Sequence, residues 1–191
     1  MIPKFDVILK KELFSCDDFN DLYTNLKSLN RTDEIHDYGI MSVHRKNLFH
    51  FDNTTNKFFK KFCNKIDEKI LAQLDYNYKK DIVTSRYSFC HYKKGDFFTW
   101  HTDSYPNYIF KSHAMSQRIV SAIIFLSDPS DYEGGELQFN INDEISSHKL
   151  PVGSTVLFPG NVMHQVKKVM SGDRKMLIIF YLSEVIDESS K

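Results

Sequence analysis

The sequence has few cysteines. Cys16, Cys63 and Cys90 are odd in number and widely spaced, and no Cys-x-x-Cys motif occurs. This pattern argues against a disulfide framework and against a structural zinc site. The same cysteine pattern favours a protein that resides in a reducing compartment.

An excess of one charge and a long apolar run are also missing. The 25 Lys and Arg residues balance the 25 Asp and Glu residues. Zero net charge argues against a bulk nucleic-acid binder, although a local basic groove is compatible with it. The longest apolar run, 119–126, is far too short to span a bilayer, and residues 1–14 lack the apolar core of a signal peptide. We therefore expect a soluble, cytoplasmic protein that does not bind membranes.

Aromatic residues are plentiful. The chain has 16 Phe and 10 Tyr among 191 residues, a composition that favours a β-rich core. A chain of this length can bury one full core, and we see neither an internal repeat nor a low-complexity linker. We expect a single domain over residues 1–191.

The first 80 residues are predicted to form a mainly helical layer. Ser15 is a candidate N-cap for a helix over 16–29, and a short strand is expected over 7–9. Asn53, Thr54 and Thr55 are candidate caps of a second helix. Its apolar stripe consists of Phe58, Phe59, Phe62, Ile66, Ile70, Leu71 and Leu74. Residues 31–52 are mixed and polar, and no secondary structure is predicted for them.

From residue 81 to 185 the pattern changes to short β-type runs separated by turn signals. The predicted strands are 83–92, 97–103, 118–126, 136–140, 147–150, 154–158, 164–169 and 176–182. No helix-length segment lies between them, which favours a sandwich, a jelly roll or a barrel. The expected fold is therefore α+β, with N-terminal helices that buttress a β core.

One strand of this core carries a possible metal motif. His101 and Asp103 are two residues apart, so in a strand their side chains would project from the same face. Two such ligands form part of the facial triad of non-haem Fe(II) sites. The His-x-Asp motif alone is weak evidence for a metal site, because roughly one chance match is expected in a chain with 8 His. A second match, His50-Phe51-Asp52, lies just ahead of a helix start, and we interpret it as a solvated or capping segment.

The downstream sequence supplies a third ligand and a cation. His164 is the first polar residue of an alternating strand, and Arg174 follows ten residues later, after a turn. A fixed guanidinium near a metal suits a dicarboxylate cosubstrate, because it can hold a carboxylate through two hydrogen bonds.

Residues 87–183 resemble the Fe(II)- and 2-oxoglutarate-dependent dioxygenases, in particular the prolyl 4-hydroxylase-like branch with its PKHD-type hydroxylases. The matching features are Tyr-x-x-Gly-x-Phe at 92–97 ahead of His-x-Asp at 101–103, and the stretches 118–137 and 150–174. The resemblance implies a double-stranded β-helix, which is a cupin-like jelly roll. It also implies that His101, Asp103 and His164 are the catalytic iron ligands.

The same resemblance implies a binding site for 2-oxoglutarate. Arg174 would bind its C5 carboxylate, and the hydroxyl groups of Tyr92 and Ser121 would assist. Some relatives carry a Tyr at the place of Phe125, so here the other three residues would hold the carboxylate alone. O₂ is the implied second substrate, and ascorbate the implied reductant.

Several functions remain open at this stage. We favour a hydroxylase of a protein or peptide side chain, with prolyl as the first candidate. The alternatives are a hydroxylase of a small molecule or of lysyl residues, a nucleic-acid dealkylase, and a non-catalytic cupin-like metal-binding module. The dealkylase branch is disfavoured because it adds a second Arg after the first, whereas Arg174 is the last Arg here. The binding module would not need Arg174.

The substrate is expected to contact the least patterned segments, 31–52 and 104–117. The second of these follows the ligand strand directly and is predicted to form a mobile lid. His113 in this segment could touch the substrate, although we favour a solvated side chain. Arg118 could bind the substrate or pair with an acidic neighbour.

Overall fold

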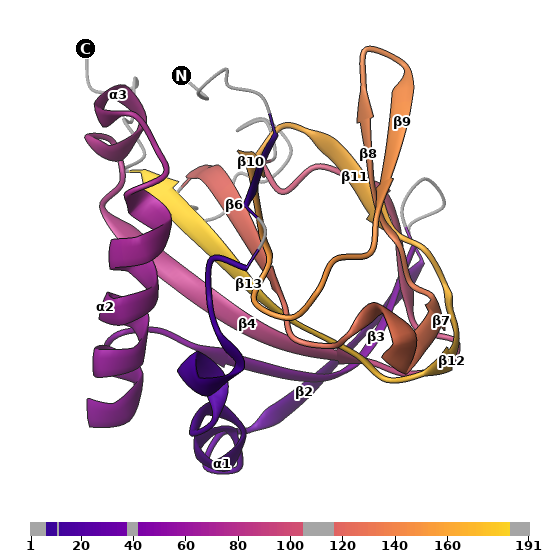
Figure 1. The fold of residues 1–191 in the computed structure, drawn as a ribbon, viewed down its shortest axis with the longest axis horizontal. Helices are drawn as coiled ribbons and strands as arrows, with labels where there is room; N and C mark the ends of the chain where they lie inside the picture. The colour runs from indigo at the N-terminus through magenta and orange to yellow at the C-terminus, as the bar shows by residue number, and fades with distance from the viewer. Residues whose placement is uncertain (1–6, 11, 38–41, 105–116, 184–191) are drawn as a thin grey trace.

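The structure, a computed structural model, describes residues 7–10, 12–37, 42–104 and 117–183. One antiparallel sheet dominates it (Figure 1). Its strands are β1 (Ile8–Lys10), β2 (Arg31–Asp37), β3 (Ser42–Phe51), β4 (Thr84–Tyr92), β5 (Phe97–His101), β6 (Gln117–Phe125), β8 (Leu137–Ile141), β9 (Glu144–His148), β10 (Thr155–Pro159), β11 (Met163–Val166) and β13 (Arg174–Ser183). The spatial order is β1-β10-β6-β13-β4-β3-β5-β11-β8-β9, and β2 pairs with β3. A second, two-stranded sheet pairs β7 (Tyr132–Gly134) with β12 (Val169–Gly172).

The large sheet curls back on itself to form a jelly roll. The rings of Phe139 on β8 and Phe158 on β10 lie 5.0 Å apart between centroids, although these strands are far apart in the order of the sheet. Side chains from β6, β10, β8 and β11 form one buried apolar cluster inside the roll. The predicted double-stranded β-helix core is confirmed.

A helical layer covers the outer face of β4, β6 and β13 (Figure 1). Its main helix, α2 (Lys57–Leu71), buries Phe59, Phe62, Ile66 and Ile70 against these strands, as the apolar stripe predicted. The prediction that residues 53–55 cap this helix is wrong. The cap is Asn56, because its side chain accepts a hydrogen bond from the Phe59 backbone N–H at 3.0 Å.

Strand β13 shows how the two apolar clusters share one sheet. Leu177, Ile179 and Tyr181 pack on the helical side, whereas Met176 and Ile178 point into the roll. This alternation follows from the period of two residues in a strand. None of the helices in the described part of the chain is long and apolar enough to cross a membrane.

The helix predicted over 16–29 is broken into two pieces. A 3-10 helix, η1 (Cys16–Phe19), is followed by the short α1 (Leu22–Leu26). Ser15 caps the first piece as predicted, since Asp18 accepts a hydrogen bond from the Ser15 backbone N–H at 2.8 Å. The continuation fails because the Asn20 backbone N–H bonds to the Asp17 carbonyl, a 3-10 contact that tightens the turn. Two further short helices are α3 (Tyr76–Lys79) and η2 (Pro129–Asp131).

The N-terminal part also contains strands that the sequence did not predict. Residues 31–37 and 42–51 form β2 and β3, so the layer over 1–80 is not mainly helical throughout, and the segment 31–52 is not a loop. The β pattern is hidden because the cavity-facing side chains include Glu34 and Arg45, which form an ion pair. The predicted strand 164–169 splits into β11 and β12.

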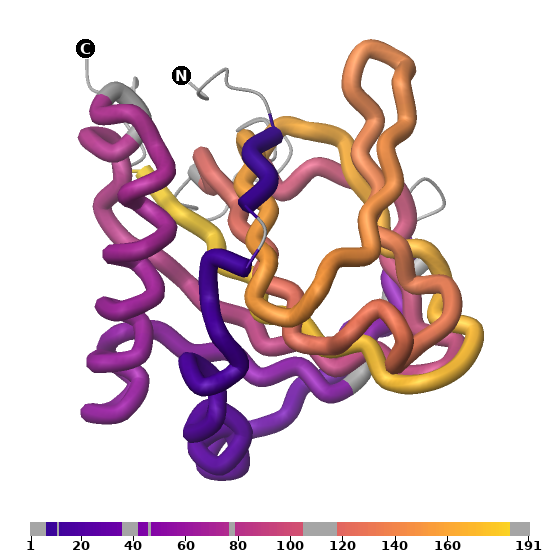
Figure 2. The backbone as a smooth tube through the Cα atoms, in the orientation of Figure 1, coloured from indigo at the N-terminus to yellow at the C-terminus, as the bar shows by residue number. Residues whose placement is uncertain are grey.

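The N-terminal segment lies against the rim of the roll. Strand β1 pairs with β10, and the Phe14 backbone N–H donates to the Gly153 carbonyl at 3.1 Å. Figure 2 shows this segment running from the helical layer up to β10. It thereby pairs an otherwise free edge of the large sheet.

Candidate active site

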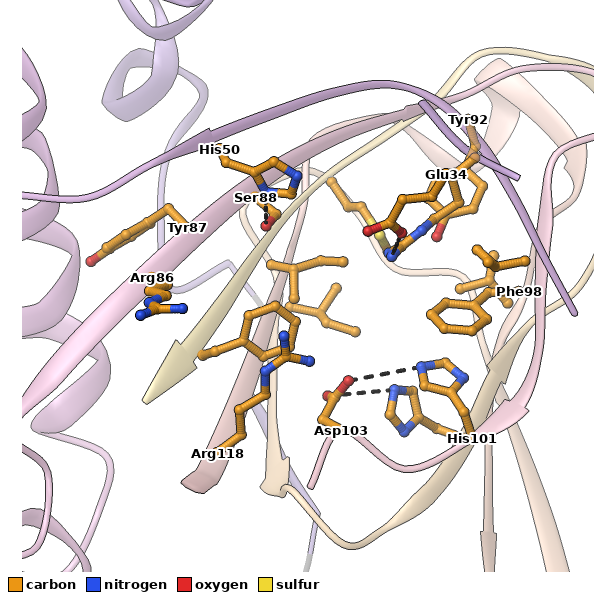
Figure 3. A pocket seen from close by; sticks show the side chains of 18 of the residues that line it. Glu34, His50, Arg86, Tyr87, Ser88, Tyr92, Phe98, His101, Asp103 and Arg118 are labelled. Carbon is orange, nitrogen blue, oxygen red and sulfur yellow. Dashed lines mark hydrogen bonds and ion pairs between the residues drawn. The ribbon is translucent and has the colours of Figure 1, made fainter. Parts of the chain in front are cut away.

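Three of the predicted site residues converge at one end of the roll. His164 on β11 is in register with His101 on β5, and Asp103 follows β5 directly. His101 Nε2 lies 3.8 Å from Asp103 Oδ1, and His164 Nε2 lies 3.6 Å from Asp103 Oδ2 (Figure 3). All three side chains are buried, and their candidate ligand atoms lie within 4.8 Å of one another. We call these residues the metal trio.

The backbone fixes which ring nitrogen of each histidine faces the trio. His101 Nδ1 lies 2.8 Å from the Thr99 carbonyl, and His164 Nδ1 lies 2.9 Å from the Val162 carbonyl. A carbonyl can only accept, so each Nδ1 carries a proton and each Nε2 presents its lone pair to the trio. Burial, together with the neighbouring His164, lowers the pKa of His101 to about 3. Its imidazole is therefore neutral and able to bind a metal at physiological pH.

Asp103 supplies the negative charge of the trio. Burial alone would raise its pKa, but the two imidazoles, Arg118 and a hydrogen bond from Ser121 outweigh burial, and the pKa lies below its usual range. Two imidazoles and one carboxylate form the donor set that suits a divalent iron site. The residues present therefore fit the metal that the sequence predicted.

Ser121 makes a different contact from the one predicted. Its hydroxyl donates to Asp103 Oδ2 at 2.6 Å, whereas its register partner on β13, Phe180, lies six residues from Arg174. The geometry thus places Ser121 behind a metal ligand and not beside Arg174. The hydroxyl orients the carboxylate and satisfies one of its lone pairs.

A stack of side chains that the sequence did not predict supports the trio from the other side. The Phe98 ring lies face to face with the His101 imidazole, with centroids 3.5 Å apart and planes 11° apart. The Arg45 guanidinium also lies over the Phe98 ring, 4.6 Å from its centroid, and pairs with Glu34. Because Phe98 precedes His101 by three residues on an irregular strand pairing, spacing alone could not indicate this stack.

Arg174 is fully buried and only partly satisfied. Its Nη1 bonds to the Met176 sulfur at 3.2 Å, but Nε and Nη2 have no partner in the described residues. The guanidinium lies 5.2 Å from the Tyr92 ring centroid, and the Tyr92 hydroxyl is also buried and unpaired. Burial raises the pKa of Tyr92 to about 12, so this hydroxyl remains a donor. Three donor atoms without acceptors fit an added carboxylate, as predicted for 2-oxoglutarate.

Gly135 makes room for this arginine. Its φ is +64°, and a Cβ built there would lie 2.9 Å from Arg174 Cδ. A side chain at this position would therefore displace the arginine. The Tyr132 hydroxyl, which the sequence did not single out, is a further buried and unpaired polar group beside this glycine.

The trio and Tyr92 open onto the same cavity of about 610 Å³. Met176, which Arg174 contacts, also lines it. The size matches sites that enclose small ligands. The predicted lid and His113 lie outside the described residues.

The second His-x-Asp match, at 50–52, lies on the cavity wall but forms no metal site. His50 Nδ1 lies 2.8 Å from the Ser88 hydroxyl, so the histidine is not merely solvated. Asp52 accepts hydrogen bonds from Thr54 and Thr55 and caps the turn before α2, as predicted.

Comparison with known proteins agrees with this geometry. A sequence model described as the 2OG-Fe(II) oxygenase superfamily matches residues 87–183. A PKHD-type hydroxylase from Pseudoalteromonas atlantica is 35% identical over 98 residues, which cover 51% of this chain and 43% of the relative. One from Synechococcus is 30% identical over 133 residues, which cover 66% and 58%. The chain spans about half the length of these relatives.

Solved structures share the fold at low sequence identity. A Pseudomonas putida prolyl-4-hydroxylase superposes with a TM-score of 0.70 at 18% identity, covering 94% of this chain and 93% of that chain. A viral collagen prolyl hydroxylase from Paramecium bursaria Chlorella virus-1 gives 0.67 at 16% identity, covering 94% and 96%. Because the family match covers the strands that carry the metal trio, Tyr92 and Arg174, the chain belongs to the 2OG-Fe(II) oxygenase superfamily.

Proposed function

We propose that this chain is an Fe(II)- and 2-oxoglutarate-dependent dioxygenase that hydroxylates a side chain of a protein or peptide, with proline as the first candidate. The observation that carries the proposal is the buried guanidinium of Arg174, with two nitrogen atoms unpaired. An unpaired buried charge costs several kcal/mol. A metal-binding module without turnover would need the trio but would gain nothing from this charge.

Each residue of the site has a distinct role in this proposal. His101, Asp103 and His164 would hold the iron, and all three side chains are buried. Arg174 and Tyr92, whose donor atoms are buried and unpaired, would take the C5 carboxylate of 2-oxoglutarate. When bound, iron and 2-oxoglutarate supply the activation of O₂. Ascorbate belongs in the assay as the expected reductant.

The choice of substrate is supported by the relatives. Two of the structures with this fold are named prolyl hydroxylases, and a third, from Trichoplax adhaerens, is described as a prolyl hydroxylase in complex with a peptide fragment. A lysyl or small-molecule hydroxylase would use the same metal trio and the same carboxylate site. The substrates to be tried first are therefore proline-containing peptides, with product mass as the readout.

The reaction class is tested by anaerobic titration of the protein with Fe(II) and then with 2-oxoglutarate. Chelation of a 2-oxo acid to iron gives a weak visible charge-transfer band. We expect this band in the wild-type protein and its loss in His164→Ala. Arg174→Met should require at least about tenfold more 2-oxoglutarate, because it loses charge-assisted hydrogen bonds.

Arg31→Met is the matched control, since Arg31 is exposed and is not among the residues that line the cavity. It should titrate like the wild-type protein. A wild-type protein that binds iron but shows no band at any 2-oxoglutarate concentration would refute the dioxygenase proposal. The cupin-like binding module would then be the better description.

A further inference from the structure

Two arginines line the cavity on the side away from Tyr92. Arg86 on β4 and Arg118 on β6 both contribute to its wall (Figure 3). Phe180 on β13 lies in register with Arg86, and the Arg118 guanidinium lies 4.0 Å from the centroid of the Phe180 ring. These three residues form what we call the arginine wall.

The positive charge of the arginine wall is not matched by the protein around it. Neither arginine forms an ion pair with an acidic side chain of the described residues, whereas Glu34 pairs with Arg45. The other acidic groups of the cavity are also engaged, since Asp52 bonds to threonines and Asp103 belongs to the metal trio. The sequence 105–116, which follows the ligand strand, contains no Asp or Glu.

The arginine wall lies close to the reacting centre. Phe180 is in register with Ser121, and the Ser121 hydroxyl holds the Asp103 carboxylate. A group bound by the two arginines would therefore have its neighbouring C–H bonds next to the metal trio.

The arginine wall is separate from the site assigned to 2-oxoglutarate. Phe180 and Arg174 lie six residues apart on β13, a span of roughly 20 Å in an extended strand. Tyr92 lies on the opposite side of the view from Arg86 and Arg118 in Figure 3. One five-carbon diacid cannot engage both ends of this strand.

The geometry points to a substrate that carries a carboxylate within a few bonds of the carbon to be hydroxylated. Arg86 and Arg118 bind the carboxylate, and the Phe180 ring packs against the adjoining apolar part. The carboxylate belongs either to a free acid or to an acidic side chain next to the target residue in a peptide. Such a subsite has a role only if the chain uses 2-oxoglutarate, and so rests on the proposed function.

The test compares two pairs of ligands in which an amide replaces this carboxylate in one member of each pair. The first pair is N-acetyl-L-proline and its N-methylamide, and the second is the blocked peptides acetyl-Pro-Asp-N-methylamide and acetyl-Pro-Asn-N-methylamide. Binding to the anaerobic complex with Fe(II) and 2-oxoglutarate is measured by calorimetry. We expect the acid of at least one pair to bind at least about tenfold more tightly than its partner, since two charge-assisted hydrogen bonds are at stake. The pair that responds identifies the source of the carboxylate.

Arg118→Gln and Arg86→Gln should each reduce this preference, whereas Arg31→Gln, which removes an exposed arginine outside the cavity, should keep it. An intact charge-transfer band in each variant shows that the iron and 2-oxoglutarate sites are preserved. Equal affinity within both pairs, binding of none of the four ligands, or a preference that survives both cavity substitutions would overturn the carboxylate subsite alone. Loss of the band from the wild-type complex would instead refute the proposed function together with this subsite.

Discussion

The oxygen atoms of the Asp103 carboxylate face different partners. Oδ1 lies towards His101, whereas Oδ2 lies towards His164 and accepts a hydrogen bond from the Ser121 hydroxyl. A metal ligand that is held by a second hydrogen bond keeps its orientation before the metal arrives. We therefore expect Ser121 to affect metal affinity directly, and turnover only through the bound metal.

Replacing Ser121 by Ala should weaken metal binding. The loss of a hydrogen bond to a metal ligand commonly costs 10-fold to about 100-fold in affinity. The measurement is a Mn(II) titration followed by electron paramagnetic resonance, which requires no turnover. Ser121→Thr restores the hydroxyl and should recover most of the affinity. Equal Mn(II) affinity in the wild-type protein and both variants would show that Ser121 does not contribute to metal binding.

Gly135→Ala should weaken 2-oxoglutarate binding while leaving the metal trio intact. The new Cβ would come within 2.9 Å of Arg174 Cδ and push the guanidinium away from Tyr92. We expect at least about a tenfold rise in the 2-oxoglutarate concentration needed for the charge-transfer band, from lost charge-assisted hydrogen bonds.

Gly95→Ala is the matched control for this substitution. Gly95 also has a positive φ, of +93°, but a Cβ there meets nothing within 4 Å. Both variants therefore carry backbone strain, and only Gly135→Ala touches the arginine. Similar 2-oxoglutarate affinities for the two variants would mean that strain, and not the position of Arg174, explains the effect.

Among the elements, η1 and α2 are joined by one carboxylate. Asp18 on η1 lies 2.6 Å from Lys65 Nζ and 3.3 Å from Lys69 Nζ, both on α2. Burial would raise the pKa of Asp18, but the bonds to Lys65, to the Ser15 backbone and to Lys69 lower it to about 2. The broken N-terminal helix is thus attached to the main helix by charge as well as by apolar packing.

This attachment predicts a pH dependence of stability. The pKa of Asp18 is lower in the folded protein than its usual value of 3.8, so its contribution is present above that value and is lost as the pH falls. At pH 7 the free energy of unfolding of the wild-type protein should exceed that of Asp18→Asn by roughly 1 kcal/mol or less, because solvent screens this partly exposed ion pair. About half of this difference should remain at pH 3. Urea unfolding at pH 7, 4 and 3 measures it, with Asp17→Asn as the exposed neighbouring control.

A difference between wild type and Asp18→Asn that is constant or grows towards acid would contradict this account. It would mean that the two helices are held together by apolar contacts such as that of Phe19 with Phe62. The charges of Lys65 and Lys69 would then be a solvated helix face.

Elements could be predicted where apolar alternation is visible in the sequence. Most strands from residue 84 onward were predicted from such runs, as was α2 from its stripe at helical spacing, whereas the short β7 was not predicted. Strands β2 and β3 were missed because their cavity-facing positions carry polar side chains, among them the pair Glu34 and Arg45. Burial of these groups is compensated by their partner across the sheet, which a local pattern cannot indicate.

The candidate site was likewise predicted only where its residues follow a recognisable spacing along the chain. The spacing of His101, Asp103, His164 and Arg174 is readable along the chain, and the structure brings the first three together. Phe98, Arg86 and Phe180 acquire their places only from the register of neighbouring strands. Ser121, which the resemblance assigned to the 2-oxoglutarate carboxylate, donates to Asp103 Oδ2, a contact that the sequence did not indicate.

At the scale of the whole molecule, the metal trio links segments that are distant in sequence. Residues 101–103 and 164 meet there, and Ser121 joins β6 to them. A ligand that binds only the folded chain stabilises it in proportion to the logarithm of its concentration. Metal removal should therefore lower the stability of the entire roll.

We expect the free energy of unfolding to rise by about 2.7 kcal/mol when free Mn(II) is present at 100 times its dissociation constant. Urea unfolding with and without the metal gives this difference, and chelation should reverse it. His164→Ala should respond little, because a ligand is missing. A metal effect of the same size in that variant would place the binding site elsewhere.

The length of β13 has a consequence for which molecules fit the roll. Arg174 begins this strand, and Phe180 lies near its other end, in register with Ser121, which contacts Asp103 of the metal trio. Because the strand is hydrogen-bonded on both sides, to β4 and to β6, it cannot lengthen or shorten to suit a guest. The spacing between Arg174 and Phe180 is therefore fixed. A 2-oxo diacid one methylene longer or shorter than 2-oxoglutarate would therefore meet the same fixed spacing along this strand.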